Sequence, residues 1–281
     1  MAPKIWEVLC ESKRIIYIQP RLYMTLSLIF LLPLSLFSLV FQLILEHLQQ
    51  QQPPTSPTII IFLSTFSLLI SSIFTNCAFI SITYSVYHSY FNQPIKLKEA
   101  IKSIYTSFFP LLATDIIVFT IFFIGLFLIA FVVIVISSLL AILGGVDLQA
   151  HSFLVLASIM LVVLPPVMYL TINLSLVKNI VVVESVWGFE PLRRSWRLVK
   201  GMKMLIFSIF CLFGSLEWML TWITGHSWVL KLVTSPILIM LSLYNIAVIT
   251  VVYIYCKEKY GELADEEFGK EKDGASLPLI A

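Results

Sequence analysis

Charged residues are scarce in this sequence. Asp, Glu, Lys and Arg make up only 12% of its 281 residues, whereas hydrophobic residues make up 59%. A soluble domain carries about 25% charged residues. No water-soluble core of this size would absorb so much apolar surface, so the composition excludes a soluble globular protein and indicates an integral membrane protein.

Paired cysteines and catalytic motifs are absent as well. The four cysteines form no CxxC pair, which argues against a disulfide framework or a zinc knuckle. The sequence has no HExxH, GxSxG, P-loop or dinucleotide-binding motif. We therefore expect a protein that is not an enzyme, with no cofactor, no bound metal and no nucleic-acid partner. A lipid-modifying enzyme is the third and least favoured functional class.

Six hydrophobic runs are long enough to cross a bilayer, which requires about 20 residues per helix. They cover residues 22–45, 58–86, 108–140, 153–177, 204–224 and 229–256. The sequence therefore predicts an all-α polytopic membrane protein with short amphipathic cytosolic helices at the interface. We expect an amphipathic N-terminal segment (1–21), a six-helix membrane domain (22–256) and a disordered tail (257–281).

The positions of the basic residues predict the orientation. With six spans, every Lys and Arg except Lys231 falls on the side that carries both termini. The positive-inside rule makes that side cytosolic. We expect a multi-pass protein of the endomembrane system or the plasma membrane, with both termini in the cytosol.

The most polar stretch, 184–203, lies between the fourth and fifth runs. Pro191 suits the first turn of a helix and Gly201 suits its end. Between them an apolar stripe recurs at helical spacing, and a basic stripe lies one residue further on. The apolar stripe consists of Leu192, Trp196 and Val199. The pattern predicts a short basic amphipathic helix at the membrane surface.

The basic side of this helix is the first candidate site. It is formed by Arg193, Arg194, Arg197, Lys200 and Lys203, with Trp196 and Glu184 beside them. One interpretation is that it binds anionic lipid headgroups of the cytosolic leaflet, or a membrane-protein partner, since each basic residue near such a surface contributes about 1 kcal/mol. The other is structural: the cluster anchors the helix and fixes the topology, and Glu184 pairs with one arginine.

Similar charged segments precede two other runs, at 11–21 and 98–110. Each is short and amphipathic and leads directly into a hydrophobic run. The three copies are either a weak internal repeat or the ordinary placement of charges at the ends of membrane helices.

Polar side chains inside the runs form the second candidate site. Asp115 lies near the cytosolic start of the third run, and Glu217 lies beyond the middle of the fifth. A charge at the centre of a membrane helix costs about 2.5–3.5 kcal/mol, so such residues are functional candidates. Three other runs contribute amides, from Asn76, Asn173 and Asn245. These residues either line a path for an ion or solute, or form interhelical hydrogen bonds.

Pro165 and Pro166 predict a break in the fourth run, because two backbone donors are lost there.

Two cysteines lie near the cytosolic side, Cys10 in the N-terminal segment and Cys256 at the end of the sixth run. Both positions permit S-palmitoylation, although an unmodified small apolar side chain is the favoured interpretation.

Two stretches form a distinctive pattern, VVVES at 181–185 and LRRSWRLVKG at 192–201. This pattern resembles the signature of a plant family of uncharacterised multi-pass membrane proteins. It is similar, more distantly, to the membrane domain that precedes the catalytic domain of some bacterial glycerophosphodiester phosphodiesterases. The resemblance implies an integral membrane protein of about six helices. It carries over no catalytic residue, because the phosphodiesterase chemistry belongs to a separate soluble domain.

The leading functional hypothesis is a non-catalytic scaffold or membrane-organising protein whose basic cytosolic face contacts anionic lipid or a partner. The alternative is a small-solute or ion transporter that uses Asp115, Glu217 and the asparagines of the spans.

Overall fold

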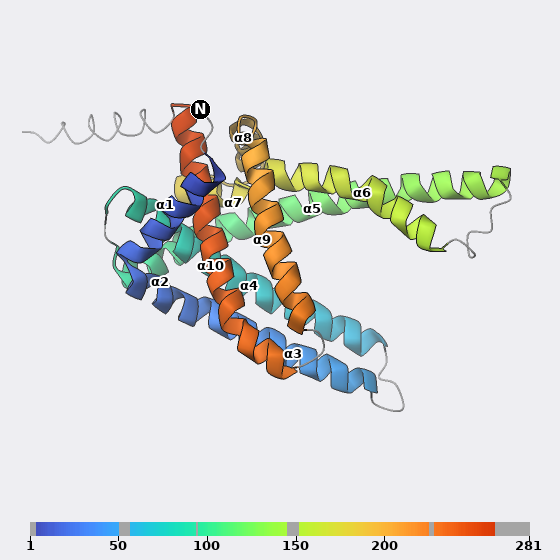
Figure 1. Cartoon of the computed structure of the whole chain (residues 1–281), viewed down its shortest axis with the longest axis horizontal. Helices are drawn as coiled ribbons and strands as arrows, with labels where there is room; N and C mark the ends of the chain where they lie inside the picture. The colour runs from blue at the N-terminus through green and yellow to red at the C-terminus, as the bar shows by residue number, and fades with distance from the viewer. Residues whose placement is uncertain (1–3, 51–56, 94, 145–151, 225–227, 262–281) are drawn as a thin grey trace, which may run out of the picture.

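The computed structural model describes residues 4–50, 57–93, 95–144, 152–224 and 228–261. Within these ranges, side chains are described except at 49–50, 57, 136–144, 152–161 and 228. The described residues form helices joined by turns, without a strand, which confirms the all-α class (Figure 1).

Six stretches of helix are long and apolar enough to cross a membrane, as the sequence predicts. They are Pro20–Leu48, Thr58–Tyr90, Leu97–Val135, Val162–Glu184, Lys203–Thr224 and Val229–Lys259. The fifth corresponds to α9 (Lys203–Thr224), whose 22 residues extend about 33 Å at 1.5 Å per residue. This length matches the thickness of the bilayer core. The fifth run is therefore long enough to cross, although it contains Glu217.

The first span contains three consecutive helical pieces. These are α2 (Pro20–Leu26), the π-helix η1 (Ser27–Leu31) and α3 (Leu32–Gln50). The other long helices are α4 (Pro57–Tyr90), α5 (Leu97–Gly144), α6 (Ser152–Leu174) and α10 (Trp228–Lys259). Three shorter helices complete the fold: α1 (Ile5–Ile18), α7 (Val177–Glu184) and α8 (Glu190–Val199).

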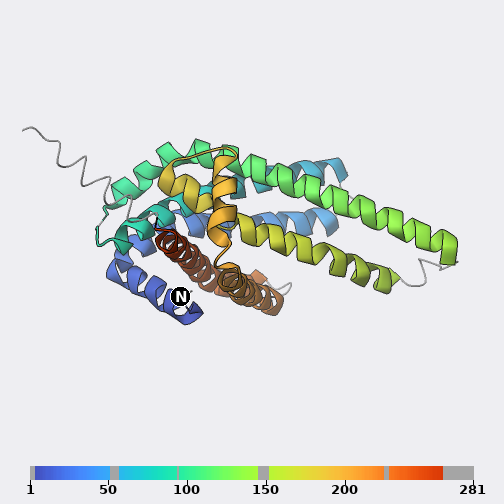
Figure 2. The same ribbon diagram turned by 90° about the horizontal axis from the view of Figure 1, so that it is seen from above.

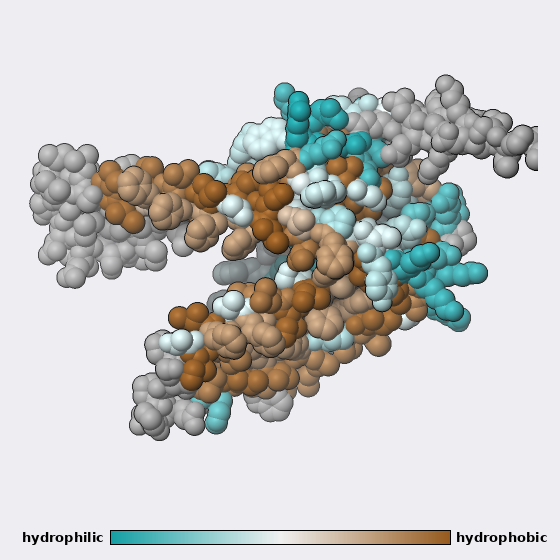
Figure 3. Space-filling model, turned by 180° about the vertical axis from the view of Figure 1, so that it is seen from behind, coloured by the Kyte–Doolittle hydropathy of each residue, from teal (hydrophilic) through white to brown (hydrophobic). Residues whose placement is uncertain are grey.

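The helices form two arms that diverge from a common end. Figures 1 and 2 show α5 and α6 side by side in one arm, whereas α3, α4, α9 and α10 extend in another direction. The arms meet where α1, α2, α7, α8 and the last turns of α10 lie, which we call the polar end. Figure 3 shows hydrophilic residues gathered at this end and hydrophobic surface over both arms.

The core lies at the polar end, where α4, α7 and α10 pack together. Its fully buried side chains include Ile82 of α4, Ile180 of α7 and Val251 of α10. Ala78 and Ala247 are also fully buried. Small residues of this kind allow membrane helices to approach closely, which replaces the hydrophobic driving force that is missing in lipid.

The fourth run differs from the sequence prediction in two ways. Helix α6 continues through Pro165 and Pro166, where we expected a break. A membrane helix tolerates prolines when neighbouring groups satisfy the freed carbonyls. The chain turns later, at residues 175–176, and α7 follows. The polar stretch 184–203 between the fourth and fifth runs is therefore preceded by a short buried helix, which the sequence does not predict.

The structure also differs from the sequence prediction at one charged segment and at the start of the tail. Helices α1 and α8 are separate, as expected, but the segment at 98–110 belongs to α5, a single helix of 48 residues. Helix α10 extends to Lys259, so Lys257 belongs to the helix rather than to a disordered tail. The tail beyond residue 261 lies outside the described residues.

Six helices that all cross would place both chain ends on the same side of the membrane. We expect epitope tags at residues 1 and 281 to become protease-sensitive together when only the cytosolic side of sealed vesicles is exposed. Tags that become sensitive on opposite sides would show that one of the six helices does not cross.

Candidate functional site

Helix α7 lies at the centre of the polar groups. It is short, and Ile180, Val181 and Val182 bury its apolar surface. It ends at Ser185, whose backbone is left-handed with φ 55° and donates its N–H to the Val181 carbonyl. The conformation is uncommon for a residue other than glycine, and it turns the chain toward α8.

Glu184, the last residue of α7, is the centre of the first polar cluster. Its carboxylate pairs with the Arg194 guanidinium of α8, accepts a hydrogen bond from the Tyr253 hydroxyl and lies 3.5 Å from Lys257 Nζ. The Glu184 side chain is 7% exposed and that of Lys257 is 0% exposed. We call these four residues the Glu184 cluster. It confirms the expectation that Glu184 pairs with an arginine.

The sequence interpretation missed two members of this cluster. Tyr253 and Lys257 come from α10, about seventy positions along the chain from Glu184. Lys257 was assigned to a disordered tail because it follows the hydrophobic run. The signal available in the sequence was the spacing of four between Tyr253 and Lys257, which places both on one face of a helix.

Asp115 is the centre of a second cluster, with Asn76 and Lys178. The Asn76 amide donates to Asp115 Oδ2 at 2.9 Å, and Lys178 Nζ donates to Asp115 Oδ2 at 3.2 Å and to Asn76 Oδ1 at 3.1 Å. These contacts form a closed triangle between α4, α5 and α7. The Asp115 carboxylate thus forms an ion pair with Lys178, one of the lysines that the sequence places on the cytosolic side.

The other polar residues predicted within the spans do not join this triangle. Asn173 is buried beside α8, and its amide donates to the Tyr169 carbonyl of its own helix. Glu217 and Asn245 are partly buried on α9 and α10. The structure therefore brings together Asp115 and Asn76 alone among the five predicted residues.

Helix α8 exposes its basic side, as its sequence predicts, but its buried side differs. Trp196 is 42% exposed, although we placed it in the apolar stripe. The buried face is formed by Pro191, Leu192, Ser195, Leu198 and Val199. The Ser195 hydroxyl donates to the Asn173 carbonyl at 2.7 Å, a contact that the sequence interpretation missed. It fixes α8 against α6.

Trp196 instead lies beside Tyr169 and Lys203. Its ring is 5.6 Å from the Tyr169 ring, centroid to centroid. Lys203 Nζ lies 4.7 Å from the centroid of the Tyr169 ring and 6.0 Å from that of Trp196. Cation–π contacts of this kind, between an aromatic pair and a lysine, suit the boundary between lipid and water.

A cleft of about 1140 Å³ lies between α8 and the α5–α6 arm. Its apolar wall comes from Ile121 of α5 and from Leu170 and Leu174 of α6. Its polar side carries Arg193, Arg194, Arg197, Lys200 and one acid, Glu190. Arg193, Arg197 and Lys200 are exposed, whereas Arg194 points inward to Glu184. We call this the α8 cleft. Its basic and apolar walls suit an amphiphile with an anionic head.

The loop between α7 and α8 is tied to α5. Gly188 has φ 90° and donates its backbone N–H to Thr114 Oγ1 at 3.3 Å. A side chain at this φ would be strained, so glycine suits the position. Through this contact and the Glu184–Arg194 pair, the start of α8 is held beside the α5–α6 arm.

The two candidate acylation sites have different surroundings. Cys10 is exposed on α1. Cys256 is fully buried, with its sulfur 3.5 Å from that of Met202. Acylation of Cys256 would require this contact to open, because the thiol has no access to solvent or lipid.

No family model, curated protein or solved structure matches this chain. The resemblance to the plant family and to the phosphodiesterase membrane domain therefore stays a prediction. The functional argument rests on the geometry of the α8 cleft and the two clusters.

The Glu184→Gln substitution tests the Glu184 cluster. It removes the carboxylate and leaves the charge of Lys257 in a fully buried position. Breaking a buried ion pair in this way costs about 3–5 kcal/mol, so we expect a markedly lower unfolding temperature in detergent. The matched control is Glu190→Gln, an exposed acid nearby, which we expect to change stability by less than about 0.5 kcal/mol.

A second variant separates a charge effect from general damage. In Glu184→Gln/Lys257→Met the fully buried ammonium is gone as well, so we expect part of the lost stability to return. A double variant no more stable than Glu184→Gln would contradict this account of the cluster.

Proposed function

We propose that this chain is a non-catalytic membrane protein that holds an anionic lipid headgroup in the α8 cleft and organises the surrounding lipid of the cytosolic leaflet. The observation that carries the proposal is the pairing of a basic rim with an apolar wall in one concave site. Arg193 and Lys200 supply charge on the rim, and Ile121 and Leu170 supply apolar surface.

The charge balance of the cleft supports an anionic ligand. Among the described residues that line it, Glu190 is the one acid, and Arg194 forms an ion pair with Glu184. The rim carries three further cations, Arg193, Arg197 and Lys200, so its net charge is positive even when one of them pairs with Glu190. Guanidinium groups suit phosphate oxygens because their donors bind in pairs.

The position of the cleft supports a lipid rather than a free anion. Its wall is formed by two helices that are apolar enough to span a membrane, and the aromatic group of Tyr169 and Trp196 lies next to it. An acyl chain can follow α5 and α6 while its headgroup stays at the rim. A partner protein with an acidic, amphipathic segment is the other occupant that this chemistry admits.

Transport through the polar residues of the spans has less support. A continuous path would need Asp115, Glu217 and the asparagines to line one route, but only Asp115 and Asn76 meet. Asp115 also pairs with Lys178, so an ion that bound there would have to displace a lysine.

The lipid proposal is tested by removing charge from the rim. We expect Arg193→Gln/Lys200→Gln to retain less phosphatidylserine after reconstitution in mixed phosphatidylserine and phosphatidylcholine nanodiscs. At about 1 kcal/mol per cation, two lost charges weaken binding by roughly 30-fold. Native mass spectrometry of the released protein measures the bound lipid.

The control is Lys98→Gln/Lys102→Gln, which removes two exposed charges from the first turns of α5, outside the cleft. We expect this variant to retain the lipid as the unmodified protein does. Equal losses in both variants would show a general surface attraction and would contradict a site in the cleft.

A further inference from the structure

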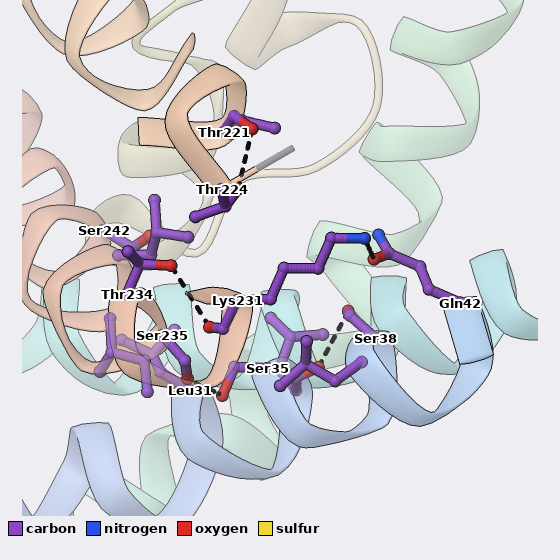
Figure 4. A pocket seen from close by; sticks show the side chains of 14 residues that line it. Leu31, Ser35, Ser38, Gln42, Thr221, Thr224, Lys231, Thr234, Ser235 and Ser242 are labelled. Atoms are coloured by element: carbon purple, nitrogen blue, oxygen red, sulfur yellow. Dashed lines mark hydrogen bonds between the residues drawn. The ribbon is translucent and has the colours of Figure 1, made fainter. Parts of the chain in front are cut away.

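A second cavity lies in the other arm, between α3, α9 and α10 (Figure 4). Its volume is about 310 Å³, near the lower end of the range typical of small-molecule sites. It borders the first half of α10, whereas the Glu184 cluster lies near the last turn of that helix. The cavity is therefore separate from the α8 cleft.

Hydroxyl groups line this cavity although it lies within the membrane-spanning part of the chain. They come from three helices: Ser35, Ser38, Thr224, Thr234, Ser235 and Ser242. In a membrane protein, polar side chains at this depth usually face the bundle interior or a water-filled space. Their convergence on one cavity from three helices indicates a polar interior site.

The hydroxyl hydrogens are largely used within the protein. Ser35 donates to the Leu32 carbonyl, Ser38 to that of Leu34, and Thr234 to that of Leu230. Ser235 donates to the Ser35 hydroxyl at 3.1 Å. A hydroxyl oxygen that donates still has lone pairs to accept with. The wall of the cavity therefore presents hydrogen-bond acceptors.

Lys231 supplies the donor. Its Nζ donates to Gln42 Oε1 at 2.9 Å and lies 3.9 Å from the Glu46 carboxylate. An ammonium group has three hydrogens, so capacity remains for a ligand beside Gln42. The Glu46 carboxylate balances the charge, which leaves this pair of residues neutral.

We propose that this cavity binds a small neutral polyol. The hydroxyl hydrogens of the polyol are accepted by the serine and threonine oxygens, and one of its oxygens accepts from Lys231. An inorganic cation would meet the Lys231 ammonium, and an anion would meet a wall of acceptors and Glu46. A neutral molecule with several hydroxyl groups can donate to the serine and threonine oxygens and accept from Lys231. Its binding makes or breaks no covalent bond.

The proposal requires that water and polyols reach the cavity. In a cysteine-free background, we would place single cysteines at Leu39 and Leu238, which line the cavity and supply no hydroxyl group. The matched controls are Val40 and Val233, on the same two helices and exposed on the outside of the bundle. Iodoacetamide alkylation would be followed by mass spectrometry in nanodiscs, with the unfolding temperature of each variant checked.

We expect the cavity cysteines to react at least about tenfold faster than the controls, because the thiolate is the reacting species and a thiol that faces lipid stays protonated. Sorbitol should slow alkylation at Leu39→Cys and Leu238→Cys about twofold at its dissociation constant, where half of the sites are occupied, and further at higher concentration. Betaine has no hydroxyl group, so it should not slow alkylation when it is added at equal osmolality. Lys231→Met should abolish the protection by sorbitol while the cysteines stay reactive.

Three results would overturn the proposal. Equal reactivity of cavity and control cysteines would show that water does not enter. Protection by betaine equal to that by sorbitol would show an osmotic effect without a polyol site. Protection that survives Lys231→Met would show that the lysine does not contribute the donor. None of these results bears on lipid retention by the α8 cleft, so the two proposals fail independently.

Discussion

The buried carboxylate of Glu184 is the interaction on which the polar end depends. It brings together α7, α8 and α10, and its cationic partner Lys257 has no exposed surface. In a low-dielectric interior such a charge is tolerated only when it is paired and hydrogen-bonded. The cluster also directs α8: because Arg194 points inward to Glu184, the neighbouring basic residues face the cleft.

Helix α7 holds both ionic clusters although it has only eight residues. A helix this short would be marginal alone, so its stability comes from the packing around it. Lys178 near its start contacts α4 and α5, and Glu184 at its end contacts α8 and α10. One buried element thus connects the two arms.

Hydropathy alone predicts the spans well, because length and apolarity determine whether a helix can cross a bilayer. It predicts the ends of the spans less well. Lys178 and Lys257 follow hydrophobic runs and look like solvent-exposed flanking charges, yet Lys257 is fully buried and each lysine forms an ion pair with an acid of another helix. Their acidic partners are distant in sequence, and pairing between distant residues leaves no local pattern.

The amphipathic helix shows a similar limit. Its boundaries follow from Pro191 and Gly201, but periodicity does not decide which side of a short helix meets the protein. Ser195 is buried, with its hydroxyl bonded to the Asn173 carbonyl, whereas Trp196 is exposed and contacts Tyr169 and Lys203. The cavity beside Lys231 was not foreseen, since serine and threonine are common throughout the spans.

The length and direction of α5 have a consequence for the bilayer itself. Its 48 residues extend about 72 Å, more than twice the thickness of the hydrocarbon layer. Because the two arms diverge, they cannot both stand parallel to the membrane normal (Figure 1). In a flat bilayer at least one arm would be tilted, and tilt is one way in which a helix longer than the hydrocarbon thickness is accommodated. The 48 residues of α5 would thus fit a bilayer of ordinary thickness only if the helix is steeply tilted or extends beyond it, whatever the α8 cleft binds.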